Sequence, residues 1–378
     1  MFYYLHLLTA HFPPLRLFRY ISFRAFLGAA TAFLIVLVLG PLVLRWLRKL
    51  NFSEQSRGMD VKQLDGFFRS KKGTPTMGGV LIIFATVGAS LLWADPANGY
   101  VLLTLGTMLF MGLLGFWDDY LKVTKKNSKG VRARHKFIWQ TVWVAAVMAI
   151  LIAWPETRKL VRELFVPFCK GPVITDMGFV CTFLFLWLVV VGATNAVNLT
   201  DGLDGLAIGC SNSAAVAYLV MSYVAGHAVF ANYLQVPHLP GVGELTVLCA
   251  CLLGAGLGFL WYNCYPAQVF MGDTGSLAIG GFIGMIAVLI KQEVALVIVG
   301  GVFVLEAMSV VLQVASFKLT GKRIFYCSPL HHHFQFKERL AAQAEGRPER
   351  MMETKITVRL CILSIIFALI GVAMLKIR

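Results

Sequence analysis

The sequence predicts an all-α polytopic membrane protein with about ten transmembrane helices, and three observations support this fold class. Of the 378 residues, 58% are hydrophobic and only 14% are charged, whereas soluble domains usually carry about 25% charged residues. The mean hydropathy is +0.74. Apolar runs of about 20 residues, the length that crosses a bilayer, recur along the whole chain. We therefore treat residues 1–378 as a single integral-membrane catalytic domain.

The apolar runs give the expected spans. They lie at 23–46, 76–95, 98–117, 136–155, 176–196, 205–226, 244–263, 275–290, 293–316 and 356–376. Only Lys291, Gln292 and Glu293 separate the eighth span from the ninth. The ninth span carries Glu306 and Gln313 inside its apolar run. Such residues usually make hydrogen bonds inside the helix bundle, and a direct role in a site is the alternative.

Lys and Arg are concentrated in particular loops, which indicates the topology. The loops after the first, third and ninth spans are rich in basic residues, and those after the second, sixth and eighth are nearly free of them. The positive-inside rule then places the loops after odd-numbered spans in the cytoplasm and both termini on the periplasmic side. The loop after the fourth span is an exception, with Arg158, Lys159, Arg162 and Lys170. The net charge of +15 fits this bias and anionic lipid or phosphate ligands, not nucleic acid.

Cysteine usage and the N-terminal residues argue against three features: a disulfide framework, a zinc site and a cleaved signal peptide. The eight cysteines mostly lie in or beside apolar runs and include no C-x-x-C pair, which argues against a disulfide framework and a zinc site. Residues 1–18 have no basic segment at their start, and Pro13 and Pro14 interrupt their apolar stretch. We therefore do not expect a cleaved signal peptide.

Two adjacent carboxylates, Asp118 and Asp119, stand where the third span ends and a lysine-rich segment begins. If the helix continues through them, Asp118 and Lys122 lie on one face at i,i+4. Asp119 is then turned away by about 100° and can form a second arm of a site. Carboxylates beside a lysine at the water boundary suit a divalent cation and a phosphate. The alternative is a charge cluster that only fixes the topology.

Five polar segments fall on the predicted cytoplasmic side and define a cleft there: residues 73–79, 118–122, 195–205, 263–276 and 329–334. Asn198, Asp201 and Asp204 are spaced three residues apart, so a short helix would align them. Asp201 or Asp204 capping a helix is the alternative. Asp273 lies between glycines, where a backbone can approach a ligand closely, although it could also be a turn residue.

The chemistry of these segments suits Mg²⁺ and phosphate. Oxygen ligands from Asp118, Asp119, Asp201 or Asp273 match the preference of Mg²⁺ for one or two carboxylates plus phosphate oxygens and water. Three successive histidines on a helix cannot all reach one metal, because neighbouring side chains diverge. We expect the histidines at 331–333 to lie on a loop beside Lys322 and Arg323 and to bond a phosphate or sugar.

The long motifs resemble those of the phospho-N-acetylmuramoyl-pentapeptide transferase family. They are GTPTMGG at 73–79, DDYLK at 118–122, NAVNLTDGLDGLAIG at 195–209, FLWYNCYPAQVFMGDTGSLAIG at 259–280 and PLHHHF at 329–334, and the likeness runs over nearly the whole chain. It implies transfer of phospho-MurNAc-pentapeptide from UDP-MurNAc-pentapeptide to undecaprenyl phosphate, with Mg²⁺ required. The products would be lipid I and UMP, made by a homodimer in the bacterial cytoplasmic membrane.

The resemblance also implies roles for individual residues. Asp118 and Asp119 match the family's catalytic pair, Asp273 matches its Mg²⁺-binding aspartate, with Asp118 as a second expected ligand, and His331 is expected to be catalytic. The remaining substrate-binding positions are Lys71, Lys72, Thr76, Lys122, Lys136, Asn198, Asp201, Gly202, Leu203, Asp204, Asn263, Phe270 and His332. Phe270 is the expected stacking partner of uracil. The chain departs from the family at Tyr326 and Cys327 and in the charged stretch 335–354.

Alternatives remain for both mechanism and function. The lipid phosphate could attack directly, since a phosphate monoester has a second pKa of about 6, or an aspartate could form a covalent intermediate. A sibling transferase that uses UDP-N-acetylhexosamine shares the aspartate chemistry, but GTPTMGG and the three histidines disfavour it. A transporter is a different class, and the clustering of acidic residues at one membrane face disfavours it.

Overall fold

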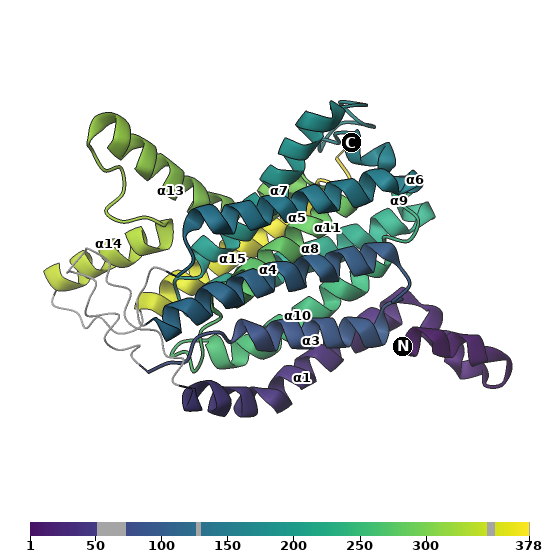
Figure 1. The fold of residues 1–378 in the computed structure, drawn as a ribbon, viewed down its shortest axis with the longest axis horizontal. Coiled ribbons are helices and arrows are strands. Elements are labelled where there is room, and N and C mark those ends of the chain that lie inside the picture. The colour runs from purple at the N-terminus through teal and green to yellow at the C-terminus, as the bar shows by residue number, and fades with distance from the viewer. Residues whose placement is uncertain (51–72, 126–129, 346–351, 378) are drawn as a thin grey trace.

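The structure is a computed structural model that describes residues 1–50, 73–125, 130–345 and 352–377, and it contains helices but no named strand in these residues. Most of the long helices run side by side along the longest axis of the molecule (Figure 1). Both termini lie at one end of this bundle, and α13 and α14 extend at the other (Figure 1).

The expected spans appear as ten apolar helices in the described residues. They are α1 (Ile21–Lys49), α3 (Gly79–Trp93), α4 (Gly99–Thr124), α5 (Ala133–Ala153), α7 (Gly178–Thr200), α8 (Leu206–Gly226), α10 (Glu244–Asn263), α11 (Gly272–Leu289), α13 (Gly301–Thr320) and α15 (Met352–Ala373). Nine of them are long and apolar enough to cross a membrane, and α3 is a shorter apolar helix. The fold class, an all-α polytopic membrane protein, is confirmed.

Short elements join the long helices. They are the 3₁₀ helices η1 (Phe2–Ala10), η2 (Pro13–Arg19) and η4 (Leu160–Arg162), and the helices α6 (Pro155–Arg158), α9 (Ala228–Leu234), α12 (Ala295–Val299) and α14 (Leu330–Ala344). A single antiparallel bridge pairs Leu164 with Ile174 within the described residues.

Most helix ends shift by a few residues, and three differences from the expectation are larger. The third span was expected to end at 117, but α4 continues to Thr124 because its acidic turn finds cationic and backbone partners, described below. The ninth span is broken at Gly300 into α12 and α13. At this break α15 approaches closely, since a Cβ on Gly301 would lie 2.6 Å from the Phe367 ring. The histidine segment was expected in a loop and instead begins α14.

Helix α11 is the buried centre of the bundle, and small residues allow its neighbours to touch it. All but the first of its residues are buried. A Cβ on Gly115 of α4 would lie 2.2 Å from the backbone oxygen of Asp273, and one on Gly280 would lie 2.6 Å from the backbone oxygen of Ala193 on α7. The close approach of α4 therefore brings its acidic turn against the start of α11.

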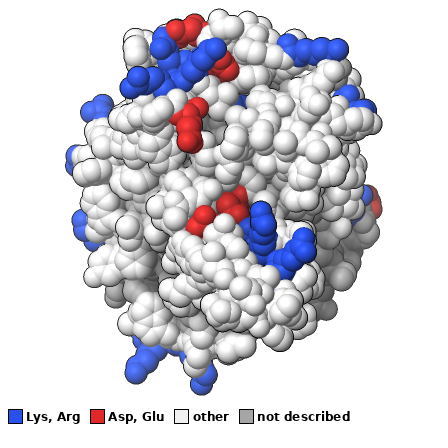
Figure 2. All heavy atoms as spheres, turned by 90° about the vertical axis from the view of Figure 1, so that its right-hand side faces the viewer, with Lys and Arg blue, Asp and Glu red and all other residues white. Residues whose placement is uncertain are grey.

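The exceptional basic loop between α5 and α7 has its charge partly compensated. Arg162 pairs with Asp176, and Lys159 Nζ lies 3.7 Å from Glu163 Oε1. Figure 2 views the end of the molecule that carries the termini, and most of its surface is uncharged, with Lys and Arg in a few groups, some beside Asp or Glu. Charged side chains are therefore sparse on this end.

Candidate active site

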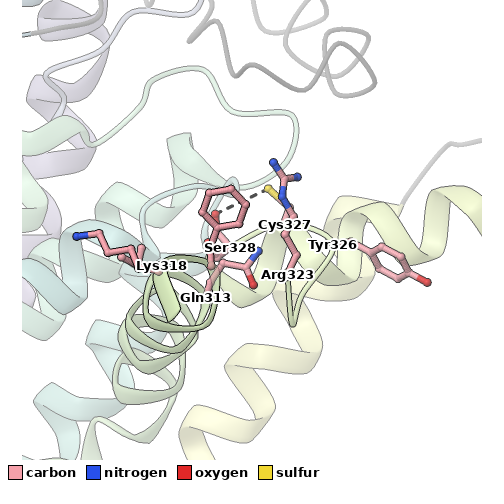
Figure 3. A pocket seen from close by; sticks show the side chains of 8 residues that line it. Gln313, Lys318, Arg323, Tyr326, Cys327 and Ser328 are labelled. Atoms are coloured by element: carbon pink, nitrogen blue, oxygen red, sulfur yellow. Dashed lines mark hydrogen bonds between the residues drawn. The ribbon is translucent and has the colours of Figure 1, made fainter. Parts of the chain in front are cut away.

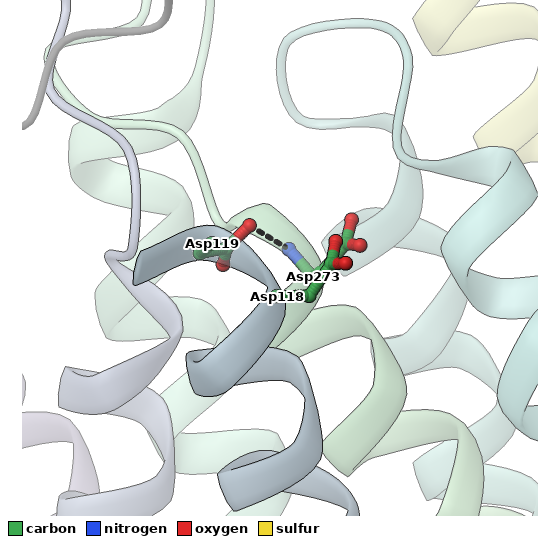
Figure 4. A group of neighbouring side chains, drawn as sticks. All are labelled: Asp118, Asp119 and Asp273. Atoms are coloured by element: carbon green, nitrogen blue, oxygen red, sulfur yellow. Dashed lines mark hydrogen bonds between the residues drawn. The ribbon is translucent and has the colours of Figure 1, made fainter. Parts of the chain in front are cut away.

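Three buried aspartates meet where α4 ends and α11 begins (Figure 4). Asp118 is 1% exposed, and Asp119 and Asp273 are each 4% exposed. One carboxylate oxygen from each lies within 4.8 Å of the others. Residues about 150 positions apart in sequence thus form one acidic cluster, as the motifs predicted.

Asp118 faces two lysines. Its Oδ2 lies 2.5 Å from Lys122 Nζ, one turn further along α4, and 2.9 Å from Lys136 Nζ on α5. Its Oδ1 accepts a hydrogen bond of 2.6 Å from the backbone N–H of Val131. The predicted i,i+4 pair of Asp118 and Lys122 is confirmed.

Asp119 points the other way and caps α11. Its carboxylate accepts hydrogen bonds from the backbone N–H groups of Asp273 (3.2 Å) and Thr274 (2.9 Å) and from the Thr274 hydroxyl (2.7 Å). The first N–H groups of a helix have no acceptor within it, and a carboxylate there also complements the helix dipole. Asp119 is the second arm that the sequence indicated, and it fixes the position of Asp273. The sequence analysis missed Thr274, although it follows Asp273 directly.

Asp273 shares the two lysines with Asp118. Its Oδ2 lies 2.9 Å from Lys122 Nζ and 2.6 Å from Lys136 Nζ. Asn198 of α7 donates to its Oδ1 (2.9 Å) and to the Ser276 hydroxyl (2.8 Å). Asp118 and Asp273 therefore direct oxygens at the same pair of cations.

Glycine is required just before Asp273. Gly272 has φ +72°, a conformation that other residues rarely adopt, and a Cβ there would lie 2.7 Å from Asp119 Oδ2 and 3.0 Å from Thr76 Oγ1. The backbone of Gly272 thus approaches Asp119 and Thr76 closely, and its close approach to a ligand stays a prediction.

This donor set fits a divalent metal ion. Three carboxylates and two ammonium groups leave one net negative charge when all are ionised. All the acidic ligands offer oxygen, which hard cations prefer. The cluster could hold such an ion, with the lysines free to turn toward a phosphate.

The 73–79 segment runs beside the start of α11. Phe270 N–H donates to Pro75 O (2.8 Å), and Gly78 N–H and Gly79 N–H donate to Phe270 O (2.8 Å) and Met271 O (2.9 Å). These bonds place Thr76 and Phe270 next to the acidic cluster. Lys71 and Lys72 lie outside the described residues.

The short helix that would align Asn198, Asp201 and Asp204 does not form. Helix α7 ends at Thr200, and Asp201 and Gly202 begin a turn that closes at Gly205, which has φ +76°. Glycines at two of these positions favour a turn over a helix. Asn198 donates to Asp273, and Asp204 Oδ2 accepts from Ala267 N–H (3.0 Å).

Two further predicted residues of this region serve the fold. Leu203 is buried, and both polar atoms of the Asn263 side chain are used: Oδ1 accepts from Gly205 N–H (3.1 Å) and Nδ2 donates to Val269 O (2.8 Å). Asn263 and Asp204 join the 201–205 turn to the 263–270 segment. Contact of these residues with substrate stays a prediction.

The three histidines lie in the first turn of α14, where Glu306 of α13 accepts from the backbone N–H of His331. Their rings have three different partners. His331 Nδ1 lies 3.1 Å from Glu306 Oε2, His332 Nδ1 lies 2.7 Å from Gln335 Oε1, and His333 Nδ1 lies 3.2 Å from the Tyr326 nitrogen. Burial, and then the charge of Lys337, lowers the pKa of His333, so a neutral ring accepts the Tyr326 N–H.

The chain matches known proteins over its full length. A family model described as Glycosyl transferase family 4 matches residues 101–291, and signature 1 of phospho-N-acetylmuramoyl-pentapeptide-transferase matches residues 71–83. Proteins named phospho-N-acetylmuramoyl-pentapeptide-transferase from Methylacidiphilum infernorum and Maridesulfovibrio salexigens are each 48% identical over 100% of both chains. One from Oleidesulfovibrio alaskensis is 45% identical over the same share. The chain belongs to the phospho-N-acetylmuramoyl-pentapeptide transferase family.

The transferase match covers the acidic cluster. The region 101–291 contains the three aspartates, both lysines and Asn198, and the signature contains Thr76. The match also spans α4, α7 and α8, which pack against α11. The resemblance read from the motifs is thereby confirmed.

The transferase chain also has a pocket of about 310 Å³ between α13 and the segment that follows it (Figure 3). Its lining residues are Gln313, Val314, Phe317, Lys318, Arg323, Tyr326, Cys327 and Ser328. Gln313 shapes this segment, because its Oε1 accepts from Ile324 N–H and Phe325 N–H, both at 3.0 Å. Tyr326 and Cys327, where the sequence predicts a departure from the family pattern, line this pocket, and none of the three aspartates does.

Proposed function

We propose that this protein transfers phospho-MurNAc-pentapeptide from UDP-MurNAc-pentapeptide to undecaprenyl phosphate and releases UMP. The product is lipid I, and the reaction is the first membrane step of peptidoglycan synthesis at the bacterial cytoplasmic membrane. The observation that carries the proposal is the buried pair Asp118 and Asp273 with Lys122 and Lys136 between them. It occurs in a chain 48% identical over its length to proteins named for this transfer.

We propose Mg²⁺ as the cofactor, with Asp118 and Asp273 as its protein ligands. Mg²⁺ usually takes one or two carboxylates and fills its remaining positions with phosphate oxygens and water. When bound, the ion would offset charge on the pyrophosphate and on the departing UMP. The all-oxygen cluster supports this choice.

The chain's own residues then position and neutralise the reactants. A phosphate oxygen of the lipid forms a bond to the sugar-linked phosphorus, and the bond from that phosphorus to the bridging oxygen of UMP breaks. Lys122 and Lys136 stabilise the negative charge on the transferred group, since positioning and electrostatics supply most of the catalysis in phosphoryl transfer. Asp118 orients the lipid phosphate or accepts a residual proton.

We propose this direct attack over a covalent aspartyl intermediate. Asp118 Oδ2 lies within 3 Å of both lysines, and an ion-paired carboxylate is a weaker nucleophile than a free one. A phosphorylated Asp118, trapped by mass spectrometry after incubation with the UDP donor without lipid, would contradict the direct route. We also propose that the protein is a homodimer, which cross-linking in native membranes tests.

The donor is tested by UMP release from the purified protein in detergent. We expect release with UDP-MurNAc-pentapeptide, a polyprenyl phosphate and Mg²⁺, and none when the lipid is omitted. Turnover only with UDP-N-acetylglucosamine would move the protein to the sibling activity. Absence of turnover with either donor would overturn the proposal.

A further inference from the structure

Glu306 is a buried carboxylate in the apolar run of α13, and it holds one histidine in two ways. It is 0% exposed, as is His331. Its oxygens accept from the backbone N–H of His331 at 3.1 and 3.3 Å. Its Oε2 also lies 3.1 Å from His331 Nδ1. A carboxylate at this distance fixes the ring orientation and keeps the proton on Nδ1.

The opposite atom of the ring is directed at the 201–204 turn. A Cβ on Gly202 would lie 2.2 Å from His331 Nε2 and 2.9 Å from its Cε1. Nε2 is buried and has no hydrogen-bond partner among the described residues. The Gly202 N–H cannot serve it, because that group donates to Thr200 O at 2.9 Å. The ring is therefore fixed at one nitrogen and unsatisfied at the other.

The His331 ring contacts the turn at 201–204. This turn directly follows α7, the helix that carries Asn198 to the acidic cluster. Asn198, one turn before Gly202, donates to Asp273 Oδ1. A residue without a side chain at 202 lets the ring pack directly on the turn backbone. Since His331 is fully buried, a ligand reaches Nε2 only when this turn moves.

We infer that Glu306 is a positioning residue of the transfer site: it acts through His331, presenting Nε2 to a phosphate oxygen of the nucleotide donor. This inference rests on the proposed function. The carboxylate holds Nδ1 and fixes the ring, so that Nε2 is directed at the phosphate oxygen, to which an Nε2–H group donates. His332, whose ring centroid lies 4.2 Å from that of His331, is the other titratable group in contact with this ring.

A purely structural role for Glu306 predicts something different. If the carboxylate only anchors the first turn of α14 through the backbone N–H of His331, its contribution to donor binding and turnover does not depend on the imidazole. Glu306→Gln would then reduce donor affinity and kcat/KM by the same factor in the His331→Asn background as in the native chain. The two roles are separable by a double-mutant cycle.

The experiment compares Glu306→Gln, Glu306→Asp, His331→Asn and the double variant Glu306→Gln/His331→Asn in the full-length protein. Two quantities are measured, the dissociation constant for UDP-MurNAc-pentapeptide by calorimetry and kcat and KM for UMP release. Glu293→Gln is the matched control, because it also removes a buried carboxylate, paired with Lys291 at 2.6 Å, away from the cluster. Thermal unfolding of every variant is recorded.

We expect Glu306→Gln to weaken donor binding or lower kcat/KM about tenfold or more, as loss of a hydrogen bond to a charged group does. His331→Asn should reduce donor binding or kcat/KM by a similar factor. The double variant should show no further reduction beyond that of His331→Asn. Glu306→Asp should retain part of the activity that Glu306→Gln loses. Native turnover in Glu306→Gln, or equal losses in both backgrounds, would overturn the inference. If donor binding changes across the four variants as expected but no variant releases UMP, the result contradicts the proposed function and leaves this inference standing.

Discussion

At the scale of the residue, two adjacent aspartates have different tasks because a helix turns about 100° between them. Asp118 faces Lys122 and Lys136, and Asp119 accepts three hydrogen bonds from Asp273 and Thr274. The i,i+4 spacing predicted the first partner. The others come from residues distant in sequence, whose approach depends on the packing of α4 against α11 and α5. Local spacing could not predict them.

Replacement of Lys136 tests how the positive charge beside the acidic cluster affects metal binding. It lies 2.9 Å from Asp118 Oδ2 and 2.6 Å from Asp273 Oδ2. Lys136→Met removes this positive charge, so the carboxylates should bind Mn²⁺ at least about tenfold more tightly, while UMP release falls. Electron paramagnetic resonance of free Mn²⁺ measures the affinity.

The control for Lys136 is Lys355→Met, which removes a lysine paired with Glu338 at 2.8 Å outside the cluster. It should leave the Mn²⁺ affinity unchanged. Weaker Mn²⁺ binding in Lys136→Met would show that the lysine does not oppose a metal ion at these aspartates.

At the scale of the element, contact between α4 and α11 sets the site. Gly115 stands at this contact, where a Cβ would lie 2.2 Å from the Asp273 backbone oxygen. Gly115→Ala should separate Asp118 from Asp273 and lower UMP release on the order of a hundredfold, since displacements of about 1 Å can cost that much. Radiometric turnover and thermal unfolding measure the effect.

Gly192→Ala is the matched control for Gly115. Gly192 also lies in a helix, α7, but a Cβ there would meet nothing within 4 Å. Alanine should be tolerated and can stabilise the helix by about 0.5–1 kcal/mol. Equal activity of the two variants would contradict the importance of the α4–α11 contact.

Helix positions could be predicted from the sequence, but helix ends and α14 could not. Apolar runs of bilayer length identified ten helices in the described residues. The turn of α4 after 117 remains helical because Lys136 and the start of α11 supply partners from elsewhere in the chain. The first turn of α14 depends likewise on Glu306. Helix α14 (Leu330–Ala344) has a mixed polar sequence without an apolar run, so hydrophobic patterning does not predict it.

At the scale of the whole molecule, the bundle has both termini at one end and the acidic cluster where α4 ends and α11 begins (Figure 1). All five polar segments that charge bias assigned to the cytoplasm connect through contacts of Thr76, Asp118, Asn198, Asp273 and His331. The segments that the positive-inside rule places on one membrane face thus lie together in the structure. Which membrane face they occupy stays a prediction.

Two exposed cysteines test that topology. Cys169 lies in the segment between α5 and α7, and Cys264 lies between α10 and α11. A membrane-impermeant maleimide should label Cys169 in intact spheroplasts and Cys264 only after permeabilisation. Single-cysteine variants analysed by mass spectrometry give the readout. The reverse pattern would invert the proposed orientation.

The central claim is that the Asp118–Asp273 cluster catalyses transfer of a phospho-sugar to a lipid with a divalent metal ion. Its most direct test is formation of radiolabelled lipid product from labelled UDP-MurNAc-pentapeptide by the native protein, Asp273→Asn and Glu293→Gln, each with Mg²⁺ or EDTA. We predict Mg²⁺-dependent product from the native protein and Glu293→Gln, and a loss on the order of a hundredfold in Asp273→Asn. Asp273→Asn that forms product at the native rate, or product formation in EDTA, would contradict the account.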